Sequence, residues 1–346
     1  MTLNLRRIDV VSIFDLRFRR ADRIPWPSIA EDNPESRIAS RLTESFGWNF
    51  YGNNIEGFQL FDLSRAVPKA AGAALRINLE SRVGSFLIWR SYDGQSDPHT
   101  LKARAWEESD QDSVLLEPVL RELRIDRIYP FLAVQIDTDE DTLDSVAEAN
   151  AEELGRLLTG DLEGERASTL RRYIEADLSR RAYEKLFLRW TEALAVYSRQ
   201  DDKIYENCMF RAVQIFEHCI LAQVSLVSIM ERMESFSRGL MLVTPWNWFS
   251  SRALFTALGS AETTFVIYPR TQSVEANRLL GEAQNQFGLA AFLASAKSKG
   301  AEVRDQFQWA KTQTLALIAV ATYVLDKIVG WDNVKCWVAA LFYHAH

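Results

Sequence analysis

The feature that most constrains this chain is an apolar stretch near its C-terminus. Residues 312–325 carry no charge, and tryptophans stand on either side of them at positions 309 and 331. In a helix that rises 1.5 Å per residue, the two rings would lie roughly 33 Å apart, close to the hydrocarbon thickness of a bilayer. Tryptophans are also typical of membrane interfaces. The stretch therefore predicts either a membrane-attached helix or the core helix of a water-soluble bundle.

Two charged residues argue against a full membrane span. Asp326 and Lys327 follow the uncharged run directly, and charges within lipid cost free energy. An uncharged run of about 10–14 residues is also more typical of a core helix. A second apolar stretch, residues 334–343, favours membrane association, because chain ends are usually polar. Packing of these helices in a soluble core or across a dimer stays the open alternative.

Basic residues precede the apolar stretch, at Lys297, Lys299, Arg304 and Lys311. The positive-inside rule then predicts that the large N-terminal part is cytoplasmic and that the C-terminus attaches it to the inner face of the cell membrane. The side chains expected to meet lipid are Trp309, Leu315, Leu317, Ile318, Val320, Val324, Leu325, Ile328, Trp331, Trp337 and Phe342.

The chain changes character near residue 140, which predicts an α+β fold. Short β-type runs at residues 8–18, 74–79, 85–89 and 129–136 come first, and helical spacing dominates afterwards. Residues 168–199 show a four-residue apolar spacing that predicts one long amphipathic helix. We expect further helices over residues 206–233, 245–258, 273–286 and from 289 to beyond 310.

This pattern divides the chain into four predicted parts. They are a mixed α/β domain over residues 1–140, a helix and acidic linker over 141–166, a helical bundle or stalk over 167–308, and hydrophobic C-terminal helices over 309–346. Helices of this length are typical of bundles and coiled coils, so we expect a homo-oligomer.

Composition narrows the function classes. The 346 residues carry a net charge of −7, which makes nucleic acid a poor partner because phosphate binding requires a basic surface. Three cysteines without a C-x-x-C pair fit a reducing compartment. No apolar signal-peptide core follows the first methionine, so we expect a cytoplasmic setting.

No motif in the chain assigns a reaction or a cofactor. Phosphate-binding, dinucleotide-binding and zinc-protease patterns are all missing from the sequence. One predicted helix carries Cys208, His218 and Cys219. The two cysteines share a face and could supply two metal ligands, but zinc sites need more. We therefore interpret them as reduced core cysteines and predict no metal site. Whether the protein is an enzyme stays open at this point.

One loop is a candidate for ligand binding. Residues 47–57 are rich in glycine and aromatic side chains, and a ligand there would meet Trp48, Tyr51, Asn53 and Asn54. An ordinary wide turn with its aromatic rings on the core is the alternative, and ordinary turn chemistry favours it.

The order of the predicted parts resembles that of the CorA-type divalent-cation channels: a cytoplasmic α/β domain, then long helices, then a hydrophobic C-terminal pair. Where that family carries Gly-Met-Asn after its first span, this chain has Gly330, Trp331, Asp332 and Asn333. The resemblance covers architecture alone, and no pore residue is carried over.

Two hypotheses about function follow. The first is a non-enzymatic, oligomeric cytoplasmic protein that senses or signals at the membrane through its C-terminal segment. The second is a soluble enzyme or ligand-binding protein, with a pocket between the α/β and helical domains.

Overall fold

A computed structural model describes residues 3–18, 58–62, 70–78, 83–115, 123–159, 166–179, 181–238, 245–263 and 274–329. The chain divides into two compact units. The sheet unit comprises Met1–Val227 and Gly259–Leu293, and the helical unit comprises Ser228–Leu258 and Ala294–His346. A sheet in the first part of the chain and long helices in the second confirm the predicted α+β class.

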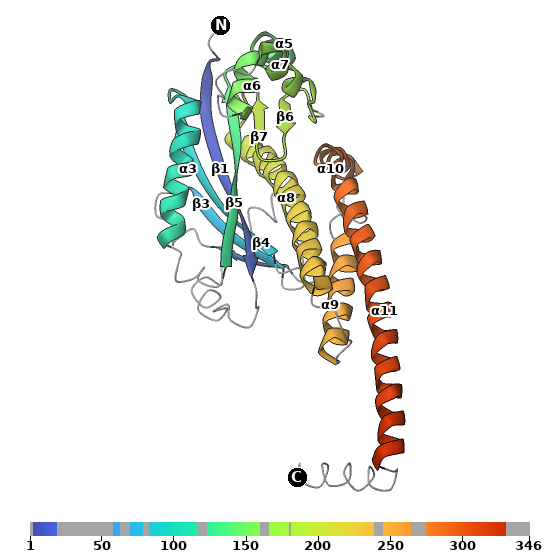
Figure 1. Ribbon diagram of the computed structural model, residues 1–346. Helices are drawn as coiled ribbons and strands as arrows, with labels where there is room; N and C mark the ends of the chain where they lie inside the picture. Colours follow the sequence, from blue (N-terminus) through green and yellow to red (C-terminus); the bar gives the residue numbers. More distant parts are fainter. Residues whose placement is uncertain are drawn as a thin grey trace. The chain divides into compact units, whose positions relative to one another are not determined.

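A mixed sheet of seven strands, counted over the described residues, forms the centre of the sheet unit (Figure 1). Its spatial order is β2-β3-β4-β1-β5-β7-β6, and every neighbouring pair is antiparallel except β5 and β7. The four runs predicted as strands are confirmed as β1, β3, β4 and β5. The strands are β1 (Leu5–Phe18), β2 (Phe58–Asp62), β3 (Gly72–Asn78), β4 (Val83–Asp93), β5 (Leu123–Ile136), β6 (Glu184–Leu188) and β7 (Ala193–Tyr197).

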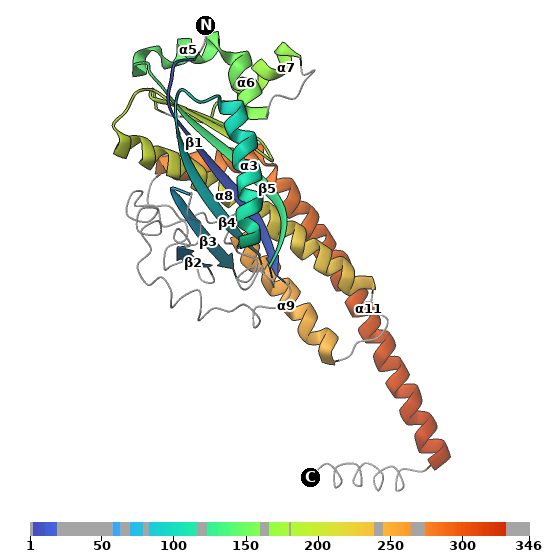
Figure 2. The same cartoon turned by 90° about the vertical axis from the view of Figure 1, so that its left-hand side faces the viewer.

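Helices cover both faces of this sheet. Helix α3 lies on one face, and the part of α8 that belongs to the sheet unit lies on the other (Figure 2). Short helices follow β5 at one end of the sheet. The helices of the sheet unit are α3 (Pro98–Leu115), the 3₁₀ turn η2 (Glu140–Thr142), α5 (Leu143–Ala149), α6 (Ala151–Thr159), α7 (Ala167–Glu175), α8 (Asp202–Arg238, up to residue 227) and α10 (Val274–Gln286).

Strand β1 shows why both faces are covered. Successive side chains of a strand point to opposite faces, and here both sets are buried. Ile8 and Val10 pack in a cluster with Leu101 of α3 and with apolar residues of β5, α5 and α6. Asp9 on the opposite face is fully buried and accepts a hydrogen bond from Tyr205 of α8.

Helix α8 is held on its face of the sheet by aromatic contacts. The ring of Phe210 packs edge-on against Trp89, with centroids 4.8 Å apart, and Phe216 packs on Phe131 at 6.1 Å. Because buried residues occupy more than one side of α8, the helix is a central element of the core, as its uncharged middle predicts.

The helical unit contains the end of α8, most of α9 (Pro245–Ala261) and most of α11 (Leu289–Val329). Helix α9 begins at Pro245, which confirms the predicted first helical residue. Phe236 of α8 packs on Phe307 of α11, and the Arg304 guanidinium lies 5.1 Å from the ring of Phe255. A Cβ placed on Gly300 would meet Leu258 at 3.3 Å, so a side chain there would crowd α9.

The single long helix predicted over residues 168–199 is wrong. The chain forms α7, then turns and makes the antiparallel pair β6–β7, which joins the sheet beside β5. All five residues of β7 are buried, because a strand covered on both faces is a continuous apolar run without alternation. Trp190, which the helix prediction put in the apolar stripe, lies between the strands and is 54% exposed.

Candidate functional site

The last turns of α11 present apolar side chains to the surroundings. Val303, Phe307 and Ala310 form a buried stripe with helical spacing, and this stripe ends at Ala310. Every residue from 315 to 325 is exposed, so no face of the helix is covered there. We name residues 312–325 the apolar segment. Its large aliphatic side chains and their exposed fractions are Leu315 57%, Leu317 55%, Ile318 56%, Val320 60%, Val324 43% and Leu325 47%.

Residues at the two ends of this segment are polar or aromatic. Trp309, one turn before it, is 62% exposed. Lys327, just after it, is exposed and holds its ammonium 5.9 Å from the centre of the Tyr323 ring. The segment thus lies between an aromatic residue and a cation.

Some of the residues predicted to act at a membrane or a pocket lie beyond the structural description. Ile328 belongs to α11, but its side chain is not among those described. Outside the described residues are Trp331, Trp337 and Phe342 of the C-terminal tail, and Trp48, Tyr51, Asn53 and Asn54 of the loop at 47–57. Their predicted roles stay predictions.

Over the described residues, a single helix is long and apolar enough to qualify as a membrane span, and it is α8, not α11. Among the described residues, α8 is long and apolar enough to cross a bilayer by length and composition, but 83% of its most apolar window is buried inside the protein. It is therefore a core helix of the fold, whereas residues 315–325 of α11 are all exposed.

A buried carboxylate joins α8 to the sheet near the start of the helix. Asp9 accepts hydrogen bonds from the Tyr205 hydroxyl at 2.6 Å and from Trp89 Nε1 at 2.8 Å, and Arg7 Nε lies 2.9 Å from it. Burial, together with the negative charge of Asp9, raises the pKa of Tyr205 well above its usual value. The hydroxyl therefore keeps its proton and holds the carboxylate in place.

Two further buried ion pairs lie along the same helix. Arg211 Nη2 donates to both carboxylate oxygens of Glu184 on β6, at 2.8 and 2.5 Å. Glu217 lies 3.2 Å from Arg76 Nε of β3 and accepts a hydrogen bond from the Ser85 hydroxyl. Burial raises the pKa of Glu217. Paired groups of this kind fix the position of a helix, because removing one partner leaves a buried charge without its counter-ion.

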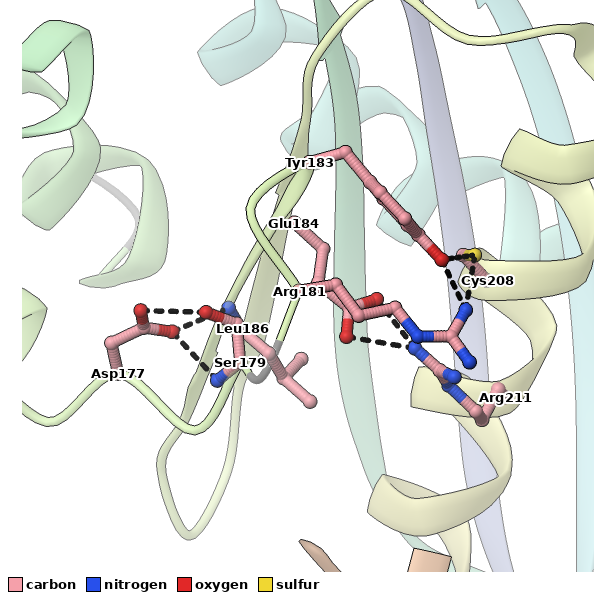
Figure 3. Close-up of polar contacts among 8 residues, drawn as sticks. All are labelled: Asp177, Ser179, Arg181, Tyr183, Glu184, Leu186, Cys208 and Arg211. Atoms are coloured by element: carbon pink, nitrogen blue, oxygen red, sulfur yellow. Dashed lines mark hydrogen bonds and ion pairs between the residues drawn. The ribbon is translucent and has the colours of Figure 1, made fainter. Parts of the chain in front are cut away.

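The connection from α7 to β6 is stabilised by its own polar contacts (Figure 3). Asp177 accepts hydrogen bonds from the backbone N–H of Ser179 at 2.8 Å and of Leu186 at 3.0 Å. Beside it, Arg181 donates to the Tyr183 hydroxyl and lies 4.0 Å from Cys208 Sγ. These contacts stabilise the turn between α7 and β6, where the sequence pattern predicts a continuous helix.

The two cysteines that the structure describes do not form a reactive site. Cys208 and Cys219 are both buried and free, and burial raises the pKa of each thiol, so neither forms the thiolate that nucleophilic attack requires. Within the described part of the chain, no three His, Cys, Asp or Glu side chains are placed to hold a metal ion. His218 is buried in the same helix.

A pocket of about 450 Å³ opens between α5, α6, α7 and β6. At its edge, Lys185 Nζ donates to Asp144 at 2.6 Å and to Asp177 at 2.9 Å. Partial burial lowers the pKa of Lys185, but the hydrogen bonds to the two aspartates outweigh it and the net shift is upward. The pocket is lined by Asp144, Ala147, Glu148, Ala151, Arg171, Ile174, Glu175, Asp177, Lys185 and Phe187.

Similarity to known proteins adds no function. Neither protein-family models, nor curated proteins, nor solved structures match this chain. The pocket was also missed by sequence reasoning, because its lining comes from four elements and two of them, α7 and β6, were predicted as parts of one helix.

Proposed function

We propose that this protein attaches to a membrane through the apolar segment of α11 and acts there as a sensing or effector protein without a reaction of its own. The observation that carries the proposal is the exposure of every residue from 315 to 325 in a run without charge. Water-soluble proteins bury such side chains, and lipid is the apolar surrounding that can enclose a helix from every direction.

The free energy available from burying these exposed side chains is large. Fully burying one aliphatic side chain is worth about 1.5–3 kcal/mol, so completing the burial of six half-exposed ones is worth on the order of 5–10 kcal/mol. A whole domain is stable by only about 5–15 kcal/mol. An energy of this size favours a lasting attachment over an isolated helix in water.

A bilayer matches the geometry better than one partner helix does. A helix packed on a single neighbour buries a stripe only somewhat wider than about 100°, and the rest of its surface stays in water. From residue 312 to the end of α11 at Val329 the helix rises roughly 27 Å, close to the hydrocarbon thickness. Trp309 and Lys327, at the two ends, are residue types that suit the interfaces.

A matched pair of substitutions tests the proposal. Ala319 of the apolar segment and Ala301, eighteen residues earlier, are both exposed positions of α11. The intact protein should sediment with membranes and resist extraction by high salt and alkaline carbonate. Ala319→Glu should shift it to the soluble fraction or to a carbonate-extractable state, whereas Ala301→Glu should leave its distribution unchanged. An intact protein that is wholly soluble without detergent would overturn the proposal.

A CorA-like assembly is a second candidate, favoured by the order of the parts: a sheet unit first, long helices next and an apolar C-terminal segment last. Several copies would then bring their apolar segments together in the membrane. Light scattering of the detergent-solubilised protein would measure the number of copies, and cation flux into reconstituted vesicles would test conduction. A monomer without flux would exclude this candidate and leave simple attachment in place.

A further inference from the structure

The pocket between α5, α6, α7 and β6 has an apolar floor. Ala147, Ile174 and Phe187 line it and are 5%, 9% and 1% exposed. Its volume of about 450 Å³ falls in the range of small-molecule sites, which is about 300–1,000 Å³. The side chains of this floor are already almost fully buried, so an aliphatic body seated on them would gain van der Waals contacts and little further burial.

The charges around this floor are unbalanced. Four carboxylates line the pocket, but only two cations do, which leaves a net charge of −2. Both cations are already engaged: Lys185 is shared by Asp144 and Asp177, and Arg171 Nη2 donates at 2.8 Å to Glu152, outside the lining. Neither cation is therefore left with its full charge for an incoming anion.

Within the described part of the chain, two carboxylates of the lining are without a counter-ion. No hydrogen bond or ion pair joins the side-chain carboxylate of Glu148 on α5 or of Glu175 on α7 to any other residue that the structure describes. An acid on an ordinary solvated helix face has no apolar cavity beside it. Here Glu148 and Glu175 line the same pocket as the apolar floor. The pocket therefore favours a ligand that carries both a positive charge and an apolar part.

We infer that this pocket binds a small organic cation with an aliphatic chain, such as an alkyl diamine. The chain packs on Ala147, Ile174 and Phe187, and the ammonium groups pair with Glu148 and Glu175. Charge-assisted hydrogen bonds between ammonium and carboxylate are stronger than neutral ones, so the two acids select cations over neutral molecules of equal length. This site lies wholly in the sheet unit, and it does not depend on how the protein meets a membrane.

Three probes of equal chain length separate charge from shape. They are 1,4-diaminobutane, butane-1,4-diol and succinate, titrated calorimetrically into the full-length protein in an uncharged detergent at neutral pH. The diamine should bind and the diol and succinate should not. Its affinity should also fall as salt is raised, because screening weakens exposed ion pairs. Equal binding of the diamine and the diol, or no binding of the diamine, would overturn the inference.

A double substitution locates the site. Glu148→Gln with Glu175→Gln keeps size and removes both charges, and it should weaken diamine binding at least about tenfold. Both side chains are exposed, so the fold should keep its unfolding temperature, which a thermal melt checks. Glu107→Gln, at an exposed position of α3 outside the pocket, is the matched control and should bind as the original protein does. Undiminished binding by the double variant would place the diamine elsewhere and refute the assignment.

Discussion

Helices α8 and α11 both contain a long uncharged apolar run, yet the two runs have opposite surroundings. In α8 the run at 219–230 is mostly buried, and Ile220 is fully enclosed. In α11 every residue from 315 to 325 is exposed, and Ile318 is 56% exposed. The difference shows that an apolar run in a sequence predicts burial of its side chains, but not whether protein or lipid buries them. In α8 the fold provides the cover, and in α11 we propose that lipid does.

Polar groups make the same contrast. Along α8, Glu217, Arg211 and Tyr205 each have a buried partner on the sheet. Along α11, Lys299 and Glu302 are one turn apart and form an ion pair whose side chains are 30% and 52% exposed. Buried pairs fix a helix in one position, whereas exposed pairs contribute little. If α8 is held by the fold and the end of α11 is not, then equal substitutions in the two helices must have unequal effects.

The largest expected difference concerns the ion pairs. The Glu184 side chain is 7% exposed and holds Arg211 of α8, whereas the Glu302 side chain is 52% exposed. Glu184→Gln should lower the free energy of unfolding by about 3–5 kcal/mol, because the buried guanidinium loses its counter-ion. Glu302→Gln should change it by less than about 0.5 kcal/mol. Urea unfolding of the full chain in detergent, followed by circular dichroism, measures both, and similar losses would remove the contrast.

The next difference concerns apolar packing. Ile220→Ala should cost about 2–5 kcal/mol, because it leaves a cavity in the core. Ile318→Ala, the same substitution in the apolar segment, should leave unfolding within about 0.5 kcal/mol while weakening attachment to vesicles. Unfolding midpoints and vesicle flotation measure the two effects separately. A stability loss at Ile318 equal to that at Ile220 would mean that the apolar segment is covered within the protein.

The smallest difference concerns one hydroxyl group. Tyr205→Phe removes a hydrogen bond to the buried Asp9 and should cost about 1–3 kcal/mol. Tyr323→Phe is the matched control, since Tyr323 is 64% exposed, and it should have almost no effect. Thermal unfolding of both variants tests this. An intact melting temperature for Tyr205→Phe would show that the Arg7 and Trp89 contacts suffice for Asp9.

The contact between Tyr205 and Asp9 also predicts how stability depends on pH. Burial raises the pKa of Tyr205 above its unfolded value near 10, so the unfolded chain loses this proton at a lower pH than the folded protein. The stability that the proton contributes is therefore complete below pH 10 and is lost as pH rises through the folded pKa. The intact protein should lose stability above pH 10 more steeply than Tyr205→Phe does. Parallel stability curves for the two proteins would contradict this assignment.

Much of the fold could be predicted from local patterns. Clean alternation over β3, apolar runs bounded by turns at β4 and β5, and Pro245 at the start of α9 are local signals, and the structure confirms them. The helix predicted over 168–199 failed because Leu186 and Leu194 keep a four-residue spacing although they lie on separate strands. What decides between helix and strand there is pairing with β5, a partner more than fifty residues away.

The candidate sites divide in the same way. The apolar segment was predictable as a long uncharged run, but its exposure was not, because the same run also fits a core helix. The pocket was not, since Glu148, Glu175 and Phe187 come from separate elements and meet only when the chain folds. The buried pairs of α8 were hidden for the same reason: a charge on a helix indicates solvent until its partner on a distant strand is known.

By itself, the sequence determined the α+β class, most of the strands, and the existence of two apolar helical runs. It could do so because hydrophobic periodicity and turn chemistry act between residues that are close along the chain. Only the tertiary structure decided that β6 and β7 extend the sheet, that α8 lies inside the fold, and that the apolar segment of α11 is left uncovered. Burial depends on which distant surfaces come together, and that information is spread over the whole chain.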